Sequence, residues 1–445
     1  MTVSSPTDPA SGKTARPRYK RRVLLAVVGL GLCIPVAALV APLQSKRLAA
    51  VGLEQAYGWF DQPAVDFGPP PGGGLSVEQI QSQLGAGYEV RFEQKEVPPE
   101  RDLFGYENPL HPEVEKFRQE TVDLVPEPFD LLEVSRRVRA LSRHTRKPGY
   151  AGDSSDVRGC LAAARNNVGL WCHHFSRIFG GLCSAHGYPN RIVSLSETGD
   201  LFGHAMCEVY LPEHDKWVAI DTDFEVTYRR DGVWLNAYEL HMTWRDVCEQ
   251  LCPGGDLQQR YKVMRANKDK VKEIANLEIV PFGHSEPALR DYALDDSVTG
   301  LHLEYFEHMF LARRDDYLSR EYSFGHPLRV RQLAFRADGQ SHLTEVGPDA
   351  IYLSAEVAYA PINTSWINVV EVRGPTELVL SGSTHTPGFD RFELRRNGEA
   401  WESVPGRGVG IRVQLKPGRN EFELRAVNGF GVRSGEPARL VVIAP

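Results

Sequence analysis

The stretch of residues 170–224 constrains the fold more than any other part of the chain. It begins with apolar residues at three- and four-residue spacing, and this period predicts an amphipathic helix: Trp171, Phe175, Ile178, Leu182 and Ala185. Gly187 and Pro189 follow the last of these and end the helix. Beyond them the apolar period changes to two, so we expect strands after the helix.

Two segments of alternating polarity, 203–211 and 216–221, follow this helix. Turn-forming residues at 212–215 join them, which predicts an antiparallel hairpin. With an even number of loop residues, His204 and Asp221 emerge on the same face of the hairpin, whereas a three-residue loop would place them on opposite faces. A helix followed by an antiparallel hairpin is typical of the α+β class.

Three residues in this stretch carry reactive side chains. Cys172 opens the predicted helix, where unpaired N–H groups and the positive end of the helix dipole favour a thiolate. His204 begins the first strand and Asp221 ends the second. A thiolate nucleophile, its general base and the carboxylate that orients the base require these residue types. Asp223 has the same strand parity as Asp221 and competes for the third role; we favour Asp221.

His173 and His174 directly follow Cys172 and raise the question of a metal site. Consecutive helical residues point about 100° apart, so these three side chains cannot chelate one ion together. We therefore expect no metal here. The disulfide pattern is left open among the other cysteines that follow the N-terminal apolar run: Cys160, Cys183, Cys207, Cys248 and Cys252.

The stretch resembles the core of the transglutaminase-like family, a branch of the papain-like cysteine fold. The matching elements are Cys172 at a helix start, the Gly-x-Pro-x-Arg turn at 187–191, the Gly-His-Ala strand start at 203–205 and the strand 217–221 that ends in Asp. Three positions depart from the family pattern: Met206 replaces the usual tryptophan, Thr222 replaces the proline after the aspartate, and the glycine before the cysteine is displaced to Gly169.

The resemblance implies a papain/transglutaminase-like core, with the catalytic helix packed on an antiparallel sheet. It also implies a cysteine acyltransferase or a peptidase/amidase that acts on amide bonds of a protein or peptide, with a Cys172–His204–Asp221 triad and neither a metal nor an organic cofactor. Amine transfer, deamidation and peptide hydrolysis stay open. The alternative is a catalytically inactive scaffold or binding module at the cell surface, since Met206 and Thr222 depart from the family.

The N-terminus points to a membrane. Residues 1–22 form a basic tail, and residues 23–43 are an apolar run without charge. About twenty such residues span a bilayer, and the excess of positive charge before the run places the N-terminus in the cytoplasm. The remainder would then be extracytoplasmic, so a cell-envelope peptide is one candidate substrate. A cleaved signal peptide is the competing interpretation, and we favour the uncleaved anchor.

Composition divides the rest of the chain. The net charge of −7, without a basic stripe beyond the N-terminus, argues against nucleic-acid binding. Periodicity and Pro/Gly content divide the rest of the chain into four further parts: a Pro/Gly-rich spacer over 44–109, the domain that resembles the transglutaminase-like family, with a helical extension, over 110–325, a β-rich connector over 326–365, and a β-sandwich over 366–445 that resembles immunoglobulin-like modules. The oligomeric state is left open.

Several local predictions complete the description. Helices are expected over 128–143, 237–251, 257–277 and 301–318. The arginines of the first helix, Arg136, Arg137 and Arg139, are expected on its solvated face. The tripeptide that begins at Asn363 fits a glycan acceptor.

Overall fold

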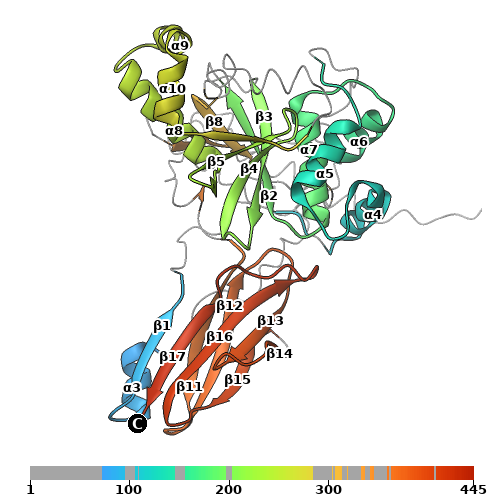
Figure 1. Cartoon of the computed structure of the whole chain (residues 1–445). Helices are drawn as coiled ribbons and strands as arrows, with labels where there is room; N and C mark the ends of the chain where they lie inside the picture. The colour runs from blue at the N-terminus through green and yellow to red at the C-terminus, as the bar shows by residue number, and fades with distance from the viewer. Residues whose placement is uncertain are drawn as a thin grey trace, which may run out of the picture. The chain divides into compact units, whose positions relative to one another are not determined.

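The computed structural model describes residues 73–95, 106–108, 110–145, 156–196, 203–283, 303, 306–312, 318, 332–335, 341–344, 358–359, 362–404 and 407–445. They form a mixed α+β structure with antiparallel sheets (Figure 1), which confirms the predicted class. The basic tail 1–22 and the predicted membrane helix 23–43 lie outside the described residues. None of the described helices combines the length and the apolar character that crossing a bilayer requires.

The helix that begins at Cys172 is α7 (Cys172–Ala185), and it packs in a layer with three shorter helices. These are α4 (Pro112–Glu120), α5 (Leu131–Ala140) and α6 (Val157–Arg165). The carboxylate of Asp130 caps α5 by accepting the N–H groups of Leu132 and Glu133, both at 3.0 Å. A short 3-10 helix, η2 (Val122–Leu124), precedes α5. The predicted helix over 128–143 is thus confirmed over most of its length.

The helices cover one face of a large antiparallel sheet whose main strand order is β10-β9-β8-β2-β3-β4-β5-β6, with β7 paired to β5. The strands are β2 (Asn190–Ser196), β3 (His204–Leu211), β4 (Lys216–Asp221), β5 (Val226–Arg230), β6 (Val233–Trp234), β7 (Glu278–Pro281), β8 (His308–Ala312), β9 (Gln332–Phe335) and β10 (Ser341–Thr344). The strands β9 and β10 fall within the predicted connector, yet they extend this sheet.

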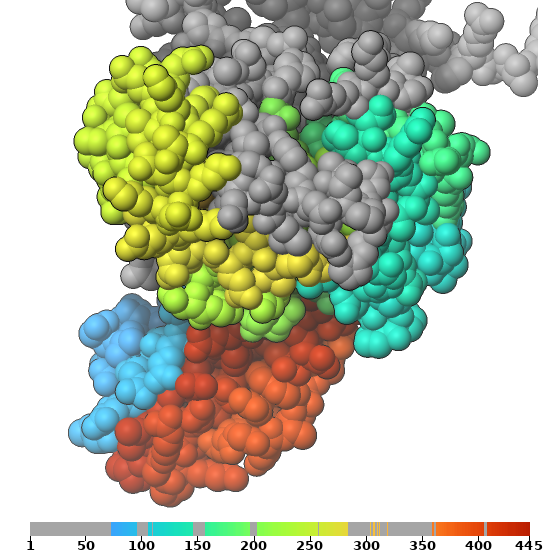
Figure 2. All heavy atoms as spheres, turned by 45° about the horizontal axis from the view of Figure 1, so that its top comes forward, coloured from blue at the N-terminus to red at the C-terminus, as the bar shows by residue number. Residues whose placement is uncertain are grey.

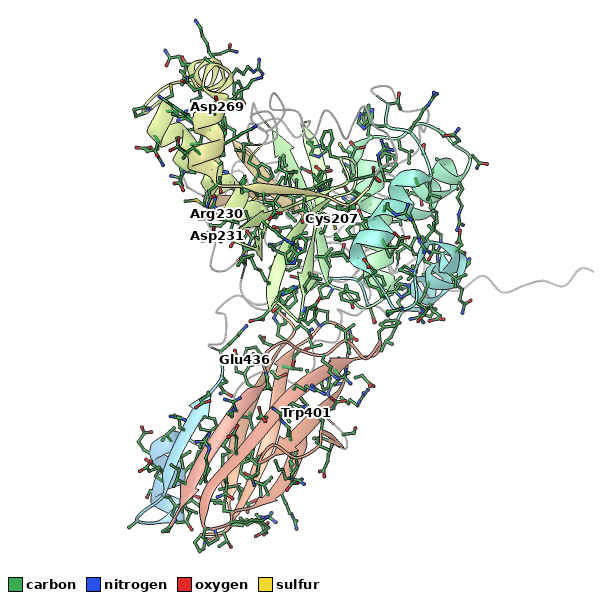
Figure 3. The ribbon with its side chains drawn as sticks, viewed as in Figure 1. Cys207, Arg230, Asp231, Asp269, Trp401 and Glu436 are labelled. Atoms are coloured by element: carbon green, nitrogen blue, oxygen red, sulfur yellow. The ribbon has the colours of Figure 1, made fainter. Side chains whose placement is uncertain are left out.

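The hairpin β3–β4 has the predicted register. Leu211 pairs with Lys216 and Cys207 with Ile220, so the turn has four residues and His204 and Asp221 share one face. The opposite face of β3 packs with α7 in one hydrophobic cluster through Ala205, Cys207 and Val209. Cys207 is labelled in Figure 3. The sheet therefore has a helix-covered face and a second face on which the two candidate residues begin.

A helical extension covers that second face. It consists of α8 (Ala237–Leu251), α9 (Leu257–Ala266) and α10 (Lys268–Ala275). The prediction over 237–251 is confirmed, and the helix predicted over 257–277 is two helices divided at Asn267. Within 301–318 the helix prediction is wrong for β8, because its buried Met309 and Leu311 lie on a strand that pairs with β2. Strand pairing at this sheet position overrides the helical spacing of the apolar residues.

The C-terminal residues form two antiparallel sheets around one core. The first has the order β1-β17-β16-β13-β14, in which β1 (Glu89–Glu93) comes from the N-terminal part of the chain, and the second has the order β11-β12-β15. The C-terminal strands are β11 (Thr364–Val372), β12 (Glu377–His385), β13 (Phe389–Arg396), β14 (Glu402–Val404), β15 (Val409–Gln414), β16 (Gly418–Asn428) and β17 (Ala438–Ala444). Asn363 is 1% exposed and donates to the Arg433 carbonyl oxygen at 3.0 Å, so it is not an accessible glycan acceptor in this fold.

The spacer predicted over 44–109 is wrong for residues 73–95. These residues form α3 (Val77–Leu84) and β1 (Glu89–Glu93), and β1 pairs antiparallel with β17. Figure 2 shows this N-terminal segment in blue against the red strands. Ile80, Leu84 and Val90 are buried in the core of the sandwich, and this burial outweighs the loop-forming Pro/Gly composition that precedes them.

Candidate active site

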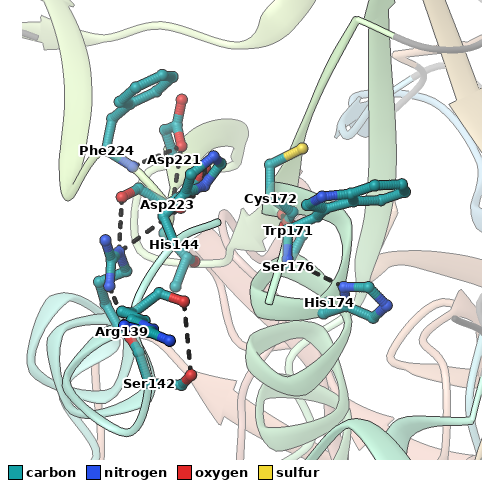
Figure 4. Close-up of polar contacts among 12 residues, drawn as sticks. Arg139, Ser142, His144, Trp171, Cys172, His174, Ser176, Asp221, Asp223 and Phe224 are labelled. Carbon is teal, nitrogen blue, oxygen red and sulfur yellow. Dashed lines mark hydrogen bonds and ion pairs between the residues drawn. The ribbon is translucent and has the colours of Figure 1, made fainter. Parts of the chain in front are cut away.

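Cys172 is the first residue of α7, as predicted. Its N-terminal neighbour Trp171 occupies the N-cap position, and the Nδ1 atom of His174 accepts the backbone N–H of Trp171 at 3.1 Å. The backbone N–H of His174 donates to the Trp171 carbonyl oxygen at 3.0 Å, whereas a helix offers no internal acceptor to its first two N–H groups, here those of Cys172 and His173. The Cys172 side chain is partly exposed, and the sulfur projects from the helix end in Figure 4. A nucleophile at this position is reachable from solvent.

Ser176 ties the start of α7 to the start of β3. Its Oγ lies 2.9 Å from the carbonyl oxygen of Cys172 and 3.1 Å from that of Ala205. Both carbonyls belong to residues at or beside the candidate reacting groups, and Ser176 itself is fully buried. One hydroxyl thus fixes the distance between the cysteine and the strand that carries His204.

His204 and Asp221 form a buried ion pair. The Nε2 atom of His204 lies 2.6 Å from Oδ2 of Asp221. The other carboxylate oxygen of Asp221 accepts the backbone N–H groups of Asp223 and Phe224, both at 3.1 Å. The turn after β4 therefore orients the Asp221 carboxylate, and Asp221 is the carboxylate hydrogen-bonded to His204, as we favoured from the sequence.

The surroundings of His204 favour the protonated form of its ring. Burial alone would lower the pKa of His204, but the negative charge of Asp221 and its hydrogen bond raise that pKa well above its usual value, with a further contribution from Cys172. The ring of Phe224 packs on the imidazole with 4.7 Å between centroids. The His204 ring therefore interacts with both the Asp221 carboxylate and the Cys172 thiol.

The structure brings the sulfur and the imidazole together. The Cys172 Sγ, a ring nitrogen of His204 and a carboxylate oxygen of Asp223 all lie within 4.8 Å of one another. Because Nε2 of His204 bonds to Asp221, Nδ1 is the nitrogen left for Cys172. Cys172, His204 and Asp221, which the sequence predicted as one site, thus form a continuous cluster.

The structure adds residues that sequence reasoning missed. Asp223 is held by Arg139, whose Nε donates to its carbonyl oxygen at 2.9 Å, and by His144, whose Nδ1 lies 3.0 Å from its Oδ1 (Figure 4). The predicted solvated face is wrong for Arg139, which is 1% exposed. Arg139 lies one helical turn after Ser135, whose hydroxyl lies 2.9 Å from that of Thr222. Residues four apart share a helix face, and this spacing could have indicated that Arg139 faces the site.

His173 and His174 make contacts other than a shared metal site. The Nε2 atom of His173 accepts from Arg177 at 3.0 Å, and the burial of the ring followed by the Arg177 charge lowers its pKa well below the usual value. Burial also lowers the pKa of His174. In the described part of the chain, Cys172, His204 and Asp223 have donor atoms close enough for one ion.

The other described cysteines, Cys160, Cys183, Cys207, Cys248 and Cys252, are thiols in this structure, as is Cys172. Cys207 is buried with its sulfur 3.8 Å from Oδ1 of Asn190. Cys252 is partly exposed at the end of α8, as Cys172 is at the start of α7. The reactivity of Cys172 can therefore be compared with that of Cys252, a thiol of similar exposure class.

Comparison with known proteins adds little to this geometry. No protein-family model matches the chain, and no curated protein matches it. One solved structure that resembles it is the crystal structure of red sea bream transglutaminase, with 10% identity, 75% of this chain and 71% of that chain covered, and a TM-score of 0.18. A score this low carries no argument, so the function is argued from the site.

Proposed function

We propose that this chain is a cysteine-dependent enzyme that transfers acyl groups from amide bonds. Cys172 is the nucleophile, His204 the general acid and base, and Asp221 the residue that orients the imidazole. The observation that carries the proposal is the continuous arrangement of a partly exposed sulfur, a ring nitrogen of His204 within 4.8 Å of it and a carboxylate 2.6 Å from Nε2 of the same ring. These are the groups and contacts that thiol catalysis needs.

The proposed acyl transfer proceeds in two steps through Cys172 and His204. The Cys172 thiolate attacks the amide carbonyl, and a tetrahedral oxyanion forms near the N-terminus of α7, where backbone N–H groups stabilise negative charge. His204 donates its Nδ1 proton to the departing amine, the carbon–nitrogen bond breaks and a thioester remains. A primary amine or water then attacks the thioester while His204 takes its proton, and this step releases the product and restores the thiolate and the imidazolium.

The substrate that we propose is a protein or peptide. Trp171, directly before the nucleophile, is 41% exposed, and its ring offers an apolar surface beside the sulfur. The basic tail and the apolar run at the N-terminus support a membrane-anchored enzyme whose site faces outward, where cell-envelope peptides are candidates. A primary amine acceptor gives a transferase, and water gives a deamidase or peptidase.

The first test compares the two partly exposed thiols. We expect iodoacetamide at pH 7 to alkylate Cys172 at least tenfold faster than Cys252, because only Cys172 lies beside an imidazolium. Replacing His204 by Ala should remove the difference by slowing Cys172 and leaving Cys252 unchanged. Mass spectrometry of the two tryptic peptides gives both rates in one sample. Equal rates in the unchanged protein would favour the inactive scaffold.

The second test identifies the reaction. A library of glutamine-containing peptides is incubated with the enzyme, with and without a labelled primary amine, and the products are weighed by mass spectrometry. Amine incorporation indicates transfer, a gain of about one mass unit indicates deamidation and shortened peptides indicate hydrolysis. Cys172→Ser is the control, and product formation by that variant would contradict the proposal.

A further inference from the structure

A second carboxylate faces the proposed nucleophile. Asp223 is not the partner of the His204 Nε2 atom, which bonds to Asp221, yet its carboxylate lies within 4.8 Å of both the Cys172 sulfur and a His204 ring nitrogen. The residue is 1% exposed. A buried carboxylate oxygen, a sulfur and an imidazole nitrogen therefore converge at one place, close enough for one metal ion to contact all three.

We propose that Cys172 Sγ, His204 Nδ1 and the Asp223 carboxylate form a zinc site whose fourth position is open to solvent. Sulfur, imidazole nitrogen and carboxylate oxygen are the ligand types that Zn²⁺ takes in proteins, and a site with three protein ligands leaves one position for water. These atoms bind metal whether or not the thiol is catalytic. The inference therefore goes beyond the proposed function.

The three donor atoms need to move only a little to bind one zinc ion. Tetrahedral zinc with bonds of about 2.0–2.3 Å holds its ligand atoms about 3.3–3.8 Å apart. The three atoms now lie within 4.8 Å of one another, so closure needs side-chain movements of about 1 Å. Because Cys172 is the first residue of α7 and is partly exposed, its side chain can rotate without displacing the core, and water can reach the remaining position.

Two of the three protein ligands, His204 and Asp223, already have supporting contacts. Asp221 bonds to Nε2 of His204 at 2.6 Å and so fixes the orientation of the ring. His144 and Arg139 hold Asp223, with Nδ1 of His144 3.0 Å from its Oδ1 and Nε of Arg139 2.9 Å from its backbone oxygen. Such outer contacts fix ligand orientation and raise metal affinity. The imidazole and the carboxylate are therefore oriented before the metal arrives, and Cys172 completes the site by rotating its side chain.

Zinc would block the thiol. The ion takes the electron pairs of the thiolate and of His204 Nδ1, and the proton that the pair carried leaves to solvent. With both groups bound to zinc, the sulfur cannot attack an amide and the imidazole cannot transfer a proton. If the proposed acyl transfer holds, zinc is a reversible inhibitor of this enzyme.

Cobalt tests the ligand set without using activity. Co²⁺ replaces Zn²⁺ in tetrahedral sites and gives a sulfur-to-metal charge-transfer absorption when a thiolate is bound. We expect this band when the full chain is titrated with Co²⁺, and we expect added Zn²⁺ to abolish it. The variant Cys172→Ser should lose the band, whereas the matched control Cys252→Ser, at the other partly exposed thiol, should keep it.

Zinc protection tests the third ligand. The rate of Cys172 alkylation is measured in EDTA and in micromolar free Zn²⁺, and the ratio of the two rates is compared between variants, so any change in the basal rate cancels. We expect Asp223→Asn to raise the zinc concentration needed for half protection at least 100-fold. His144→Ala, at a side chain that is 28% exposed, should raise it about 10–100-fold through the lost outer contact.

The outcomes separate the two proposals. The zinc site would be overturned if no cobalt band appears or if the band survives Cys172→Ser. It would also be overturned if zinc protects the unchanged protein, Asp223→Asn and His144→Ala equally. Selective Cys172 alkylation in EDTA concerns the proposed enzyme alone. A thiol that is unreactive in EDTA but binds cobalt would therefore contradict the enzyme and leave the metal site supported.

Discussion

At the scale of single residues, the charge of Asp221 decides the protonation of His204. Asp221 lies 2.6 Å from the imidazole and raises its pKa well above the usual value against the opposing effect of burial. Each pKa unit gained corresponds to about 1.4 kcal/mol in favour of the imidazolium. The folded protein therefore holds this proton at pH values where an unfolded histidine has lost it.

We predict that Asp221→Asn lowers the pKa of His204, because burial remains and the compensating charge is gone. Ring resonances of His204 in a two-dimensional NMR titration should show deprotonation at a lower pH in the variant. The linked stability has a definite sign. A raised pKa stabilises the fold below about pH 6.5 and ceases to do so as the pH rises through the folded value. The variant should therefore lose more stability at pH 6 than at pH 10, and equal losses would contradict the assignment.

At the scale of elements, α7 approaches its neighbours through glycines. A Cβ atom added to Gly181 would lie 2.7 Å from Cγ1 of Val157 on α6, and one added to Gly180 would lie 2.7 Å from Oδ1 of Asn190 on β2. Both distances are shorter than side chains tolerate. The absence of side chains here lets α7 lie close to α6 and β2, and this packing sets where Cys172 stands relative to the sheet.

Gly181→Ala should destabilise the protein. Alanine normally stabilises a helix by about 1 kcal/mol relative to glycine, but overpacking against Val157 costs about 1–3 kcal/mol, so we expect a net loss. Urea unfolding followed by circular dichroism measures the change in the free energy of unfolding. A variant as stable as the unchanged protein would mean that α6 moves aside, and the slope of the transition would then report whether the native state has loosened.

Elements with a strong local pattern were predictable from the sequence. The period of α8 and the parity of β3 and β4 follow from neighbouring residues, so the shared face of His204 and Asp221 could be derived. The role of Arg139 could not, because its partner Asp223 lies 84 residues away in the chain. The same holds for β8, whose strand state depends on pairing with β2. Local periodicity contains no information about which distant backbone supplies a partner.

At the scale of the whole molecule, residues 73–95 belong to the sandwich. Besides the pairing of β1 with β17, the backbone N–H of Leu75 donates to Val369 at 2.7 Å, and the Trp366 indole N–H donates to the Lys95 carbonyl at 2.7 Å. Burial of Ile80, Leu84 and Val90 stabilises the fold by about 1.5–3 kcal/mol for each side chain. The segment is therefore an integral layer of the sandwich.

Truncation distinguishes this arrangement from a spacer. A chain that begins at Gly73 should keep a sandwich of unchanged thermal stability, whereas one that begins at Glu96 should unfold at a lower temperature and aggregate. The second truncation exposes the edge of β17, and unpaired strand edges recruit other chains. Differential scanning calorimetry and light scattering on the two proteins measure both effects. Identical behaviour would show that β1 contributes nothing to stability.

The pairing of β1 with β17 also determines when the sandwich can be completed during protein synthesis. Glu93 and Arg439, which bridge the two strands, are separated by 346 positions. At a synthesis rate of about 5–20 residues per second, β1 leaves the ribosome roughly 17–70 s before its partner exists. During translation β1 therefore stays unpaired and accessible to chaperones. It can pair with β17 only after β17 has left the ribosome.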